Sequence, residues 1–195
     1  PVSRETIILD HIGGREAAAR LVAGRLEDVL VDGDAPRVGT IYRAIAERPV
    51  KGQGGMFLRT PDGPAFLRQV RGIAPGQALL VQITGQAEPG KALPVTQKLL
   101  FKSRYCIVTP DAPGLNISRA IRDEARRDTL LQIAHGEMDG TEQGLILRSA
   151  CLDADDTAIT EDIRAMADLA AAVLADMAGE AEMLTEGDSP HQLAF

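Results

Sequence analysis

Four short runs of β-forming residues, separated by glycine, proline and polar turns, lie between positions 40 and 84. The runs are Thr40–Glu47, Gly55–Arg59, Pro64–Arg68 and Ala78–Thr84. Thr60-Pro61-Asp62-Gly63 joins the second run to the third and is a strong signal for a hairpin turn. Four or five short strands at this spacing favour a small β-barrel over a sandwich.

Three more short strands are predicted before the barrel, with Gly13-Gly14 and Gly24-Arg25 as the turns between them. They are Thr6–Leu9, Ala18–Val22 and Leu26–Val31. So few strands cannot form a stable domain alone. We therefore expect them to pair with strands after the barrel, near Arg104–Val108 and Gly144–Ala150. The barrel would then be an insertion within an α/β unit.

The carboxy-terminal part of the chain has a helical period. Ser118 is predicted to cap a helix that ends near Ala134, because apolar residues recur there at three-to-four spacing. Thr160 is predicted to cap a second helix, Ile163–Met177, with acidic residues in its first turn. Residues 182–195 show no period, and we expect them to fray.

Charge is distributed very unevenly along the chain. Residues 37–127 contain fifteen Lys and Arg against six Asp and Glu, although the whole chain has a formal charge of −7. Five of the six aromatic residues lie in the same stretch. Because cations follow phosphates and rings stack on bases, this composition is typical of a single-stranded nucleic-acid site. The alternative is a chance cluster on a solvated face.

Other features argue against several classes of protein. The longest apolar runs, Ala78–Ile83 and Leu169–Ala175, are far shorter than the roughly 20 residues of a membrane span. No series of charged, apolar and small residues opens the sequence, so we do not expect a secretory signal. Cys106 and Cys151 lack CxxC spacing, so we predict two free, buried thiols in a cytoplasmic protein. The three histidines show no metal-ligand spacing.

Three residues are candidates for holding a polynucleotide. Phe57 and Phe66 lie in adjacent predicted strands, on either side of the hairpin turn. If both rings face outward, each could stack on a base and contribute about 1–3 kcal/mol. The alternative is that one or both fill the end of the barrel. Lys91, on the loop that leaves the barrel, could neutralise a nearby phosphate or could simply be solvated.

The order of several motifs along the chain resembles the amino-terminal part of the ribonuclease E/G family. The motifs are Gly39-Thr40-Ile41-Tyr42, Met56-Phe57-Leu58, Ala65-Phe66-Leu67, Gly76–Ile83, Lys91, Tyr105–Pro110, Asn116–Ile121 and Gly144–Ala150. The resemblance covers roughly residues 5–178. It implies an RNase H-like subdomain (residues 1–36 and 93–185) interrupted by an S1-type OB-fold (residues 37–92), with residues 186–195 as a frayed tail.

The resemblance also implies roles for individual residues. Phe57, Phe66 and Lys91 match the barrel residues that hold single-stranded RNA in the family. Arg148 and Ser149 stand where the family has an Arg-Thr pair that grips the 5′-monophosphate of the substrate. Ser103 and Ile107 stand where a Gly and a Val line the same pocket. The alternative for Arg148, at the end of an apolar strand, is a structural ion pair.

The family cleaves RNA with a pair of magnesium-binding Asp residues on a later subdomain, which a zinc link follows. This sequence contains no counterpart of either, so we predict neither catalytic residues nor a metal or other cofactor in the chain. The acidic run Asp153, Asp155 and Asp156 could suggest a replacement metal site. A solvated loop before a helix N-terminus explains it better.

Three functions are therefore in competition. The chain is the RNA-binding, 5′-phosphate-recognising portion of a magnesium-dependent endoribonuclease of RNA processing, or a stand-alone RNA-binding regulatory module without catalysis. The third alternative is an α/β scaffold whose acidic carboxy-terminal helix docks onto a protein. The expected partners are single-stranded RNA, further copies of the chain, or a missing nuclease subdomain, and no membrane.

Overall fold

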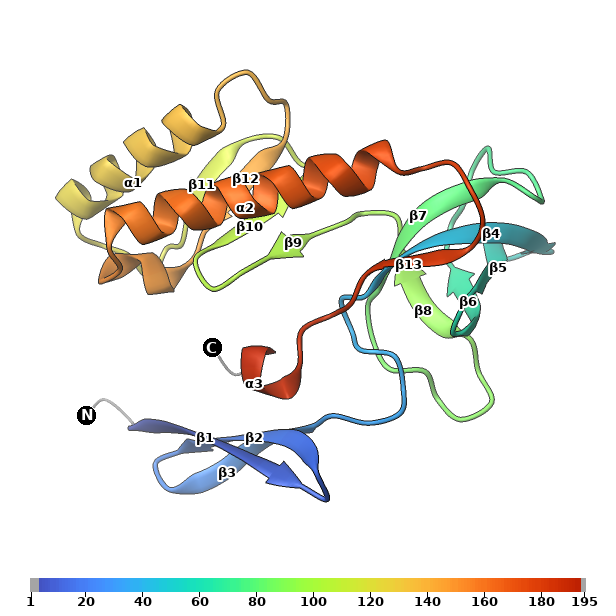
Figure 1. Cartoon of the computed structure of the whole chain (residues 1–195), viewed down its shortest axis with the longest axis horizontal. Helices are drawn as coiled ribbons and strands as arrows, with labels where there is room; N and C mark the ends of the chain where they lie inside the picture. The colour runs from blue at the N-terminus through green and yellow to red at the C-terminus, as the bar shows by residue number, and fades with distance from the viewer. Residues whose placement is uncertain (1–3, 194–195) are drawn as a thin grey trace.

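A computed structural model describes residues 4–193, which form three β-sheets and three α-helices (Figure 1). The strands are β1 (Glu5–Ile12), β2 (Arg15–Val22), β3 (Arg25–Val31), β4 (Ile41–Val50), β5 (Gly55–Thr60), β6 (Gly63–Leu67), β7 (Ala78–Ile83), β8 (Leu93–Thr96), β9 (Phe101–Lys102), β10 (Cys106–Thr109), β11 (Leu115–Ile117), β12 (Gly144–Leu147) and β13 (Glu182–Thr185). The helices are α1 (Glu124–Glu137), α2 (Asp156–Ala175) and α3 (Pro190–Leu193), with a 3₁₀ turn η1 (Ser149–Leu152). The chain is therefore a mixed α+β protein.

The predicted barrel is present. Strand β4 pairs with both β5 and β7, which closes β4-β5-β6-β8-β7 into a five-stranded barrel consistent with an OB-fold. The predicted hairpin turn joins β5 to β6. Leu93–Thr96 is part of the barrel, because β8 pairs with β6 and β7. The barrel therefore extends past the boundary expected at residue 92.

Every second side chain of the barrel strands points inward and fills the core of the barrel. On β5, Met56 and Leu58 face inward, and on β6 Ala65 and Leu67 do so. Successive residues of a strand point to opposite faces, so the residues between them point out of the barrel. The buried face thus fixes the register of these strands, because a slip of one residue would expose the whole core.

A second core lies between a four-stranded sheet and two helices. The sheet has the order β11-β12-β10-β9, and α1 and α2 pack against it and against each other (Figure 1). Its centre contains large side chains that are fully buried, among them Val108, Leu145, Leu147, Ile159 and Ile163.

The amino-terminal strands do not pair as we expected. Strands β1, β2 and β3 form a separate antiparallel sheet, and neither β10 nor β12 pairs with it. Both edges of β10 and of β12 are already occupied by other strands of the four-stranded sheet, so no hydrogen-bonding edge is left. The short helix α3 packs on β2 (Figure 1). The predicted ladder between the two parts is wrong.

The predicted helix starts are also wrong. Helix α1 begins at Glu124, and Asp123 caps it by accepting a hydrogen bond from the Arg126 N–H (2.8 Å). Ser118 instead continues the extended chain, since its N–H donates to the Leu147 carbonyl (2.8 Å). Helix α2 begins at Asp156, so Thr160 lies inside it, with its hydroxyl bonded to the Asp156 carbonyl.

The segment expected to fray is ordered up to Leu193. Strand β13 pairs with β4, and α3 follows it. Ser189 and Pro190 are buried, and the His191 ring lies 2.9 Å from the Asp10 carbonyl oxygen. Backbone pairing and local contacts, which leave no periodic pattern in the sequence, order this segment. Residues 194–195 lie outside the described part.

Arg43 joins the barrel to the segment after α2. Its side chain is only 6% exposed and makes ion pairs with Asp176 (2.8 Å) and Glu182 (2.6 Å). It also donates to the backbone carbonyl groups of Asp176 and Glu180. One guanidinium therefore holds the end of α2 and the start of β13 against β4.

Arg43→Met should lower the free energy of unfolding by about 2 kcal/mol, because several hydrogen bonds to a charged group are lost at once. Chemical denaturation measures the change. Arg59→Met is the matched control: Arg59 is 51% exposed and lies 3.6 Å from Glu47, so its loss should cost less than about 1 kcal/mol. Equal effects of the two substitutions would contradict the structural role of Arg43.

Candidate nucleic-acid interface

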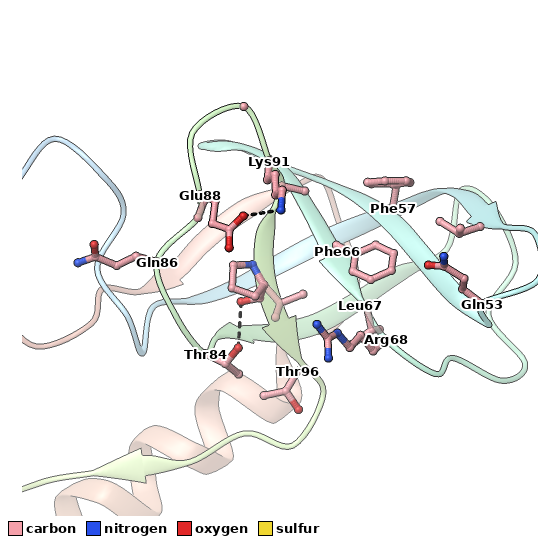
Figure 2. A pocket seen from close by; sticks show the side chains of 16 residues that line it. Gln53, Phe57, Phe66, Leu67, Arg68, Thr84, Gln86, Glu88, Lys91 and Thr96 are labelled. Carbon is pink, nitrogen blue, oxygen red and sulfur yellow. Dashed lines mark hydrogen bonds and ion pairs between the residues drawn. The ribbon is translucent and has the colours of Figure 1, made fainter.

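Two phenyl rings lie side by side on the outer face of the barrel. Phe57 on β5 and Phe66 on β6 are directly opposite each other in the antiparallel ladder. Both are half-buried, and their ring centroids are 5.3 Å apart with planes inclined by 54° (Figure 2). Their strand neighbours fill the core, so alternation turns both rings outward. Neither ring fills the barrel end.

The position of Phe66 depends on a glycine. A Cβ added at Gly55 would lie 2.4 Å from Cζ of Phe66 and 3.2 Å from the Leu67 carbonyl oxygen. The Phe66 ring therefore lies directly on bare backbone, beside Phe57. A side chain at position 55 would push the ring off the barrel surface.

An open groove of about 860 Å³ runs beside the rings (Figure 2). Phe57, Phe66 and Lys91, the three residues predicted to act together, all line it. Arg68 and Glu88 line it as well. The groove thus combines an aromatic wall with charges of both signs.

The two cationic side chains of the groove differ in whether they form an ion pair. Lys91 forms an ion pair with Glu88, and the two side chains are 70% and 71% exposed. Such an exposed pair contributes at most about 1 kcal/mol, so an incoming anion could displace Glu88. Arg68 forms no ion pair within residues 4–193. Arg68 was not among the predicted site residues, although its two-residue spacing from Phe66 indicates the same face of the strand.

The structure also brings together residues of the second candidate site. Arg148 donates to the Ser103 carbonyl (2.5 Å), and the Arg148 N–H donates to the Tyr105 carbonyl (2.8 Å). Ile107 lies on β10, whose ladder with β12 ends just before Arg148. Ser149 is exposed at the start of η1. Arg148 is therefore anchored to backbone and not to an acidic side chain.

An unpredicted carboxylate lies at this second site. Asp162 on α2 accepts hydrogen bonds from the Ser103 hydroxyl (2.5 Å) and the Tyr105 N–H (3.2 Å). The sequence placed Asp162 in the first turn of a helix and gave no sign of this contact, which arises only when α2 packs near β10. Its negative charge opposes the binding of a phosphate close to Ser103.

The two thiols are free and buried, as predicted. Desolvation raises the pKa of Cys106 to about 12 and that of Cys151 to about 11. Both thiols therefore stay protonated at neutral pH, and a protonated thiol is a poor nucleophile.

One residue of the acidic run at the start of α2 has a structural partner. Asp156 forms an ion pair with Arg126 (2.6 Å), whereas Asp155 stands at the N-cap of α2 without a side-chain capping hydrogen bond. Between residues 4 and 193, no group of three or more His, Cys, Asp or Glu side chains is placed to hold a metal ion. The residues present do not fit a magnesium site. None of the helices in this range is long and apolar enough to cross a membrane.

These features define a mixed α+β protein whose OB-like barrel carries an aromatic and cationic groove. A model of the ribonuclease E/G family matches residues 101–192. A ribonuclease E of Synechocystis sp. is 25% identical over 165 residues, which cover 76% of this chain and 24% of the relative. A ribonuclease E of Nostoc sp. is 24% identical over 168 residues, with 77% and 24% covered.

These matches support membership of the ribonuclease E/G family. It spans about a quarter of the length of the curated relatives that it matches.

Gly55→Ala should displace the Phe66 ring and destabilise the barrel by about 1–3 kcal/mol, as over-packing does. Loss of the nuclear Overhauser contacts between the Phe57 and Phe66 rings, together with denaturation, measures both effects. Gly136→Ala on α1 is the control: its added Cβ meets no atom within 4 Å, so helix propensity should make it neutral or stabilising. Unchanged ring contacts in Gly55→Ala would contradict the packing described here.

Proposed function

We propose that the barrel binds single-stranded RNA along the groove beside Phe57 and Phe66. The observation that carries the proposal is the pair of outward-facing rings, opposite each other in one ladder, next to cationic side chains. Rings stack on any base, whereas cations attract the phosphates between the bases. Membership of the ribonuclease E/G family supports RNA as the polynucleotide.

In this proposal the chain is the RNA-recognition portion of an endoribonuclease that acts in RNA processing or decay in the cytoplasm. The relatives named ribonuclease E are about four times longer than the matched region, so cleavage belongs to the whole protein in this scheme. A stand-alone RNA-binding module is the alternative. The barrel, including β8, would be the S1-type domain. Residues 1–36 and the part of 93–185 that follows β8 would belong to an RNase H-like unit.

Phe57→Ala and Phe66→Ala should each weaken the binding of a single-stranded oligonucleotide by about 1–3 kcal/mol, since each removes one stacking surface. Fluorescence anisotropy over a range of salt concentrations measures the affinity and its salt dependence. Affinity should also fall steeply as salt rises, because bound phosphates release counterions.

Two further variants serve as controls for this test. Lys91→Ala should weaken binding less than either Phe substitution, because the attraction of the lysine for a phosphate is partly offset by the loss of its ion pair with Glu88. Phe101→Leu alters a ring that is only 3% exposed in the other core, and it should leave affinity unchanged in the folded protein. If all these variants bind RNA like the parent chain, the barrel groove is not the binding site.

A second proposed activity is recognition of the 5′-monophosphate of RNA near Arg148. The anchoring of Arg148 to the Ser103 carbonyl and the exposed Ser149 beside it favour this proposal. A guanidinium and a hydroxyl suit phosphate oxygens. The Asp162 carboxylate acts against it, because it places a negative charge on the other side of Ser103.

Asp162→Asn should increase the preference for 5′-monophosphorylated over 5′-hydroxyl oligonucleotides, because it removes the charge and keeps an oxygen that accepts from Ser103. Arg148→Gln should abolish the preference. Binding competition between the two oligonucleotides measures the ratio of affinities. A ratio of one in the parent chain and in Asp162→Asn would remove 5′-end recognition from the proposed function.

A further inference from the structure

A row of four residues crosses the barrel at right angles to its strands. Arg48 on β4 is paired with Phe57, Phe57 with Phe66, and Phe66 with Pro94 on β8. All four therefore lie on neighbouring strands at one level of the sheet. The two rings and Pro94 line the groove (Figure 2), and Arg48 stands at the end of the row next to Phe57.

A β-bulge places Arg48 in this row. The register of β4 against β5 shifts between Ala46, which is opposite Leu58, and Arg48, which is opposite Phe57. Ala46 and Leu58 both face the core. Without the extra residue, Glu47 would stand opposite Phe57. A β-bulge changes which side chain points to a given face of the sheet. This bulge places the guanidinium of Arg48 beside the Phe57 ring, where the carboxylate of Glu47 would otherwise lie.

The Arg48 side chain is available for a ligand. Its guanidinium carbon lies 4.8 Å from the Phe57 ring centroid. Within residues 4–193 it forms neither an ion pair nor a side-chain hydrogen bond, whereas Glu47 is paired with Arg59 at 3.6 Å. Stacking against a ring holds the guanidinium plane in place while its N–H groups stay free.

We propose that one base of the bound RNA stacks on the guanidinium plane of Arg48, while the N–H groups at the edge of the guanidinium donate to a phosphate. This inference rests on the proposed function of the barrel. Arg48 therefore contributes through its flat shape as well as its charge, which distinguishes it from Lys91, and its contact with the Phe57 ring distinguishes it from Arg68. The bulge at Glu47 is the backbone feature that brings Arg48 to this position beside Phe57.

The test compares Arg48→Lys and Arg48→Gln with Arg164→Lys and Phe57→Ala, measured by anisotropy with a single-stranded RNA oligonucleotide at several salt concentrations. Lysine keeps the charge but not the plane. Arg48→Lys should weaken binding about fivefold or more and leave the salt slope unchanged. Arg48→Gln should also reduce the slope by about 0.7, the value for one phosphate on a single strand. Arg164 is an exposed arginine of α2 that pairs with Glu137 and does not line the groove, so Arg164→Lys should bind like the parent chain.

The possible failures are distinguishable. If Phe57→Ala weakens binding but Arg48→Lys binds like the parent chain, Arg48 acts as a plain charge and the inference is overturned alone. If Phe57→Ala has no effect, the proposed function and the inference fall together. Because Arg48 is exposed, thermal unfolding should show that all variants fold, and an equal loss in Arg164→Lys would also overturn the special role of Arg48.

Discussion

Burial of one face of the barrel strands determines what the other face can present. Met56 and Leu58 on β5, with Ala65 and Leu67 on β6, are locked into the core, and a slip of one residue would bring all of them to the surface. The outward positions of Phe57 and Phe66 follow directly from this constraint. The core thus sets the outward orientation of the rings, and the bare backbone at Gly55 and the contact between the two rings fix their position on the surface.

This dependence explains how much of the protein could be predicted from its sequence. The barrel strands, their hairpin turn and the pairing of Phe57 with Phe66 follow from local pattern and turn chemistry, which the sequence contains. Arg68 was within reach of the same reasoning. Arg48 was not, because strict alternation would have placed Glu47 on the outer face, and a bulge becomes visible only in the ladder.

Features that depend on contacts between distant segments could not be predicted from the sequence. Asp162 meets Ser103 only because α2 packs near β10, and the ordered β13 depends on pairing with β4. The expected ladder between the amino-terminal strands and β10 or β12 was wrong because those strands already have neighbours on both edges. The helix starts were misplaced because Ser118 bonds to Leu147 and not to its own helix.

Ion pairs with the acidic residues after residue 127 determine in part which cations remain available for a ligand. Among the fifteen Lys and Arg of residues 37–127, Arg37, Arg43 and Arg126 form ion pairs with acids that lie after residue 127. These pairs support the fold and remove three charges from any binding surface. Arg48 and Arg68 lie beside or near the rings without such partners in the described residues. Part of the charge excess in the sequence is therefore used in structural ion pairs. Arg48 and Arg68 instead leave cationic groups beside the rings of the barrel, where stacking and phosphate attraction can act together.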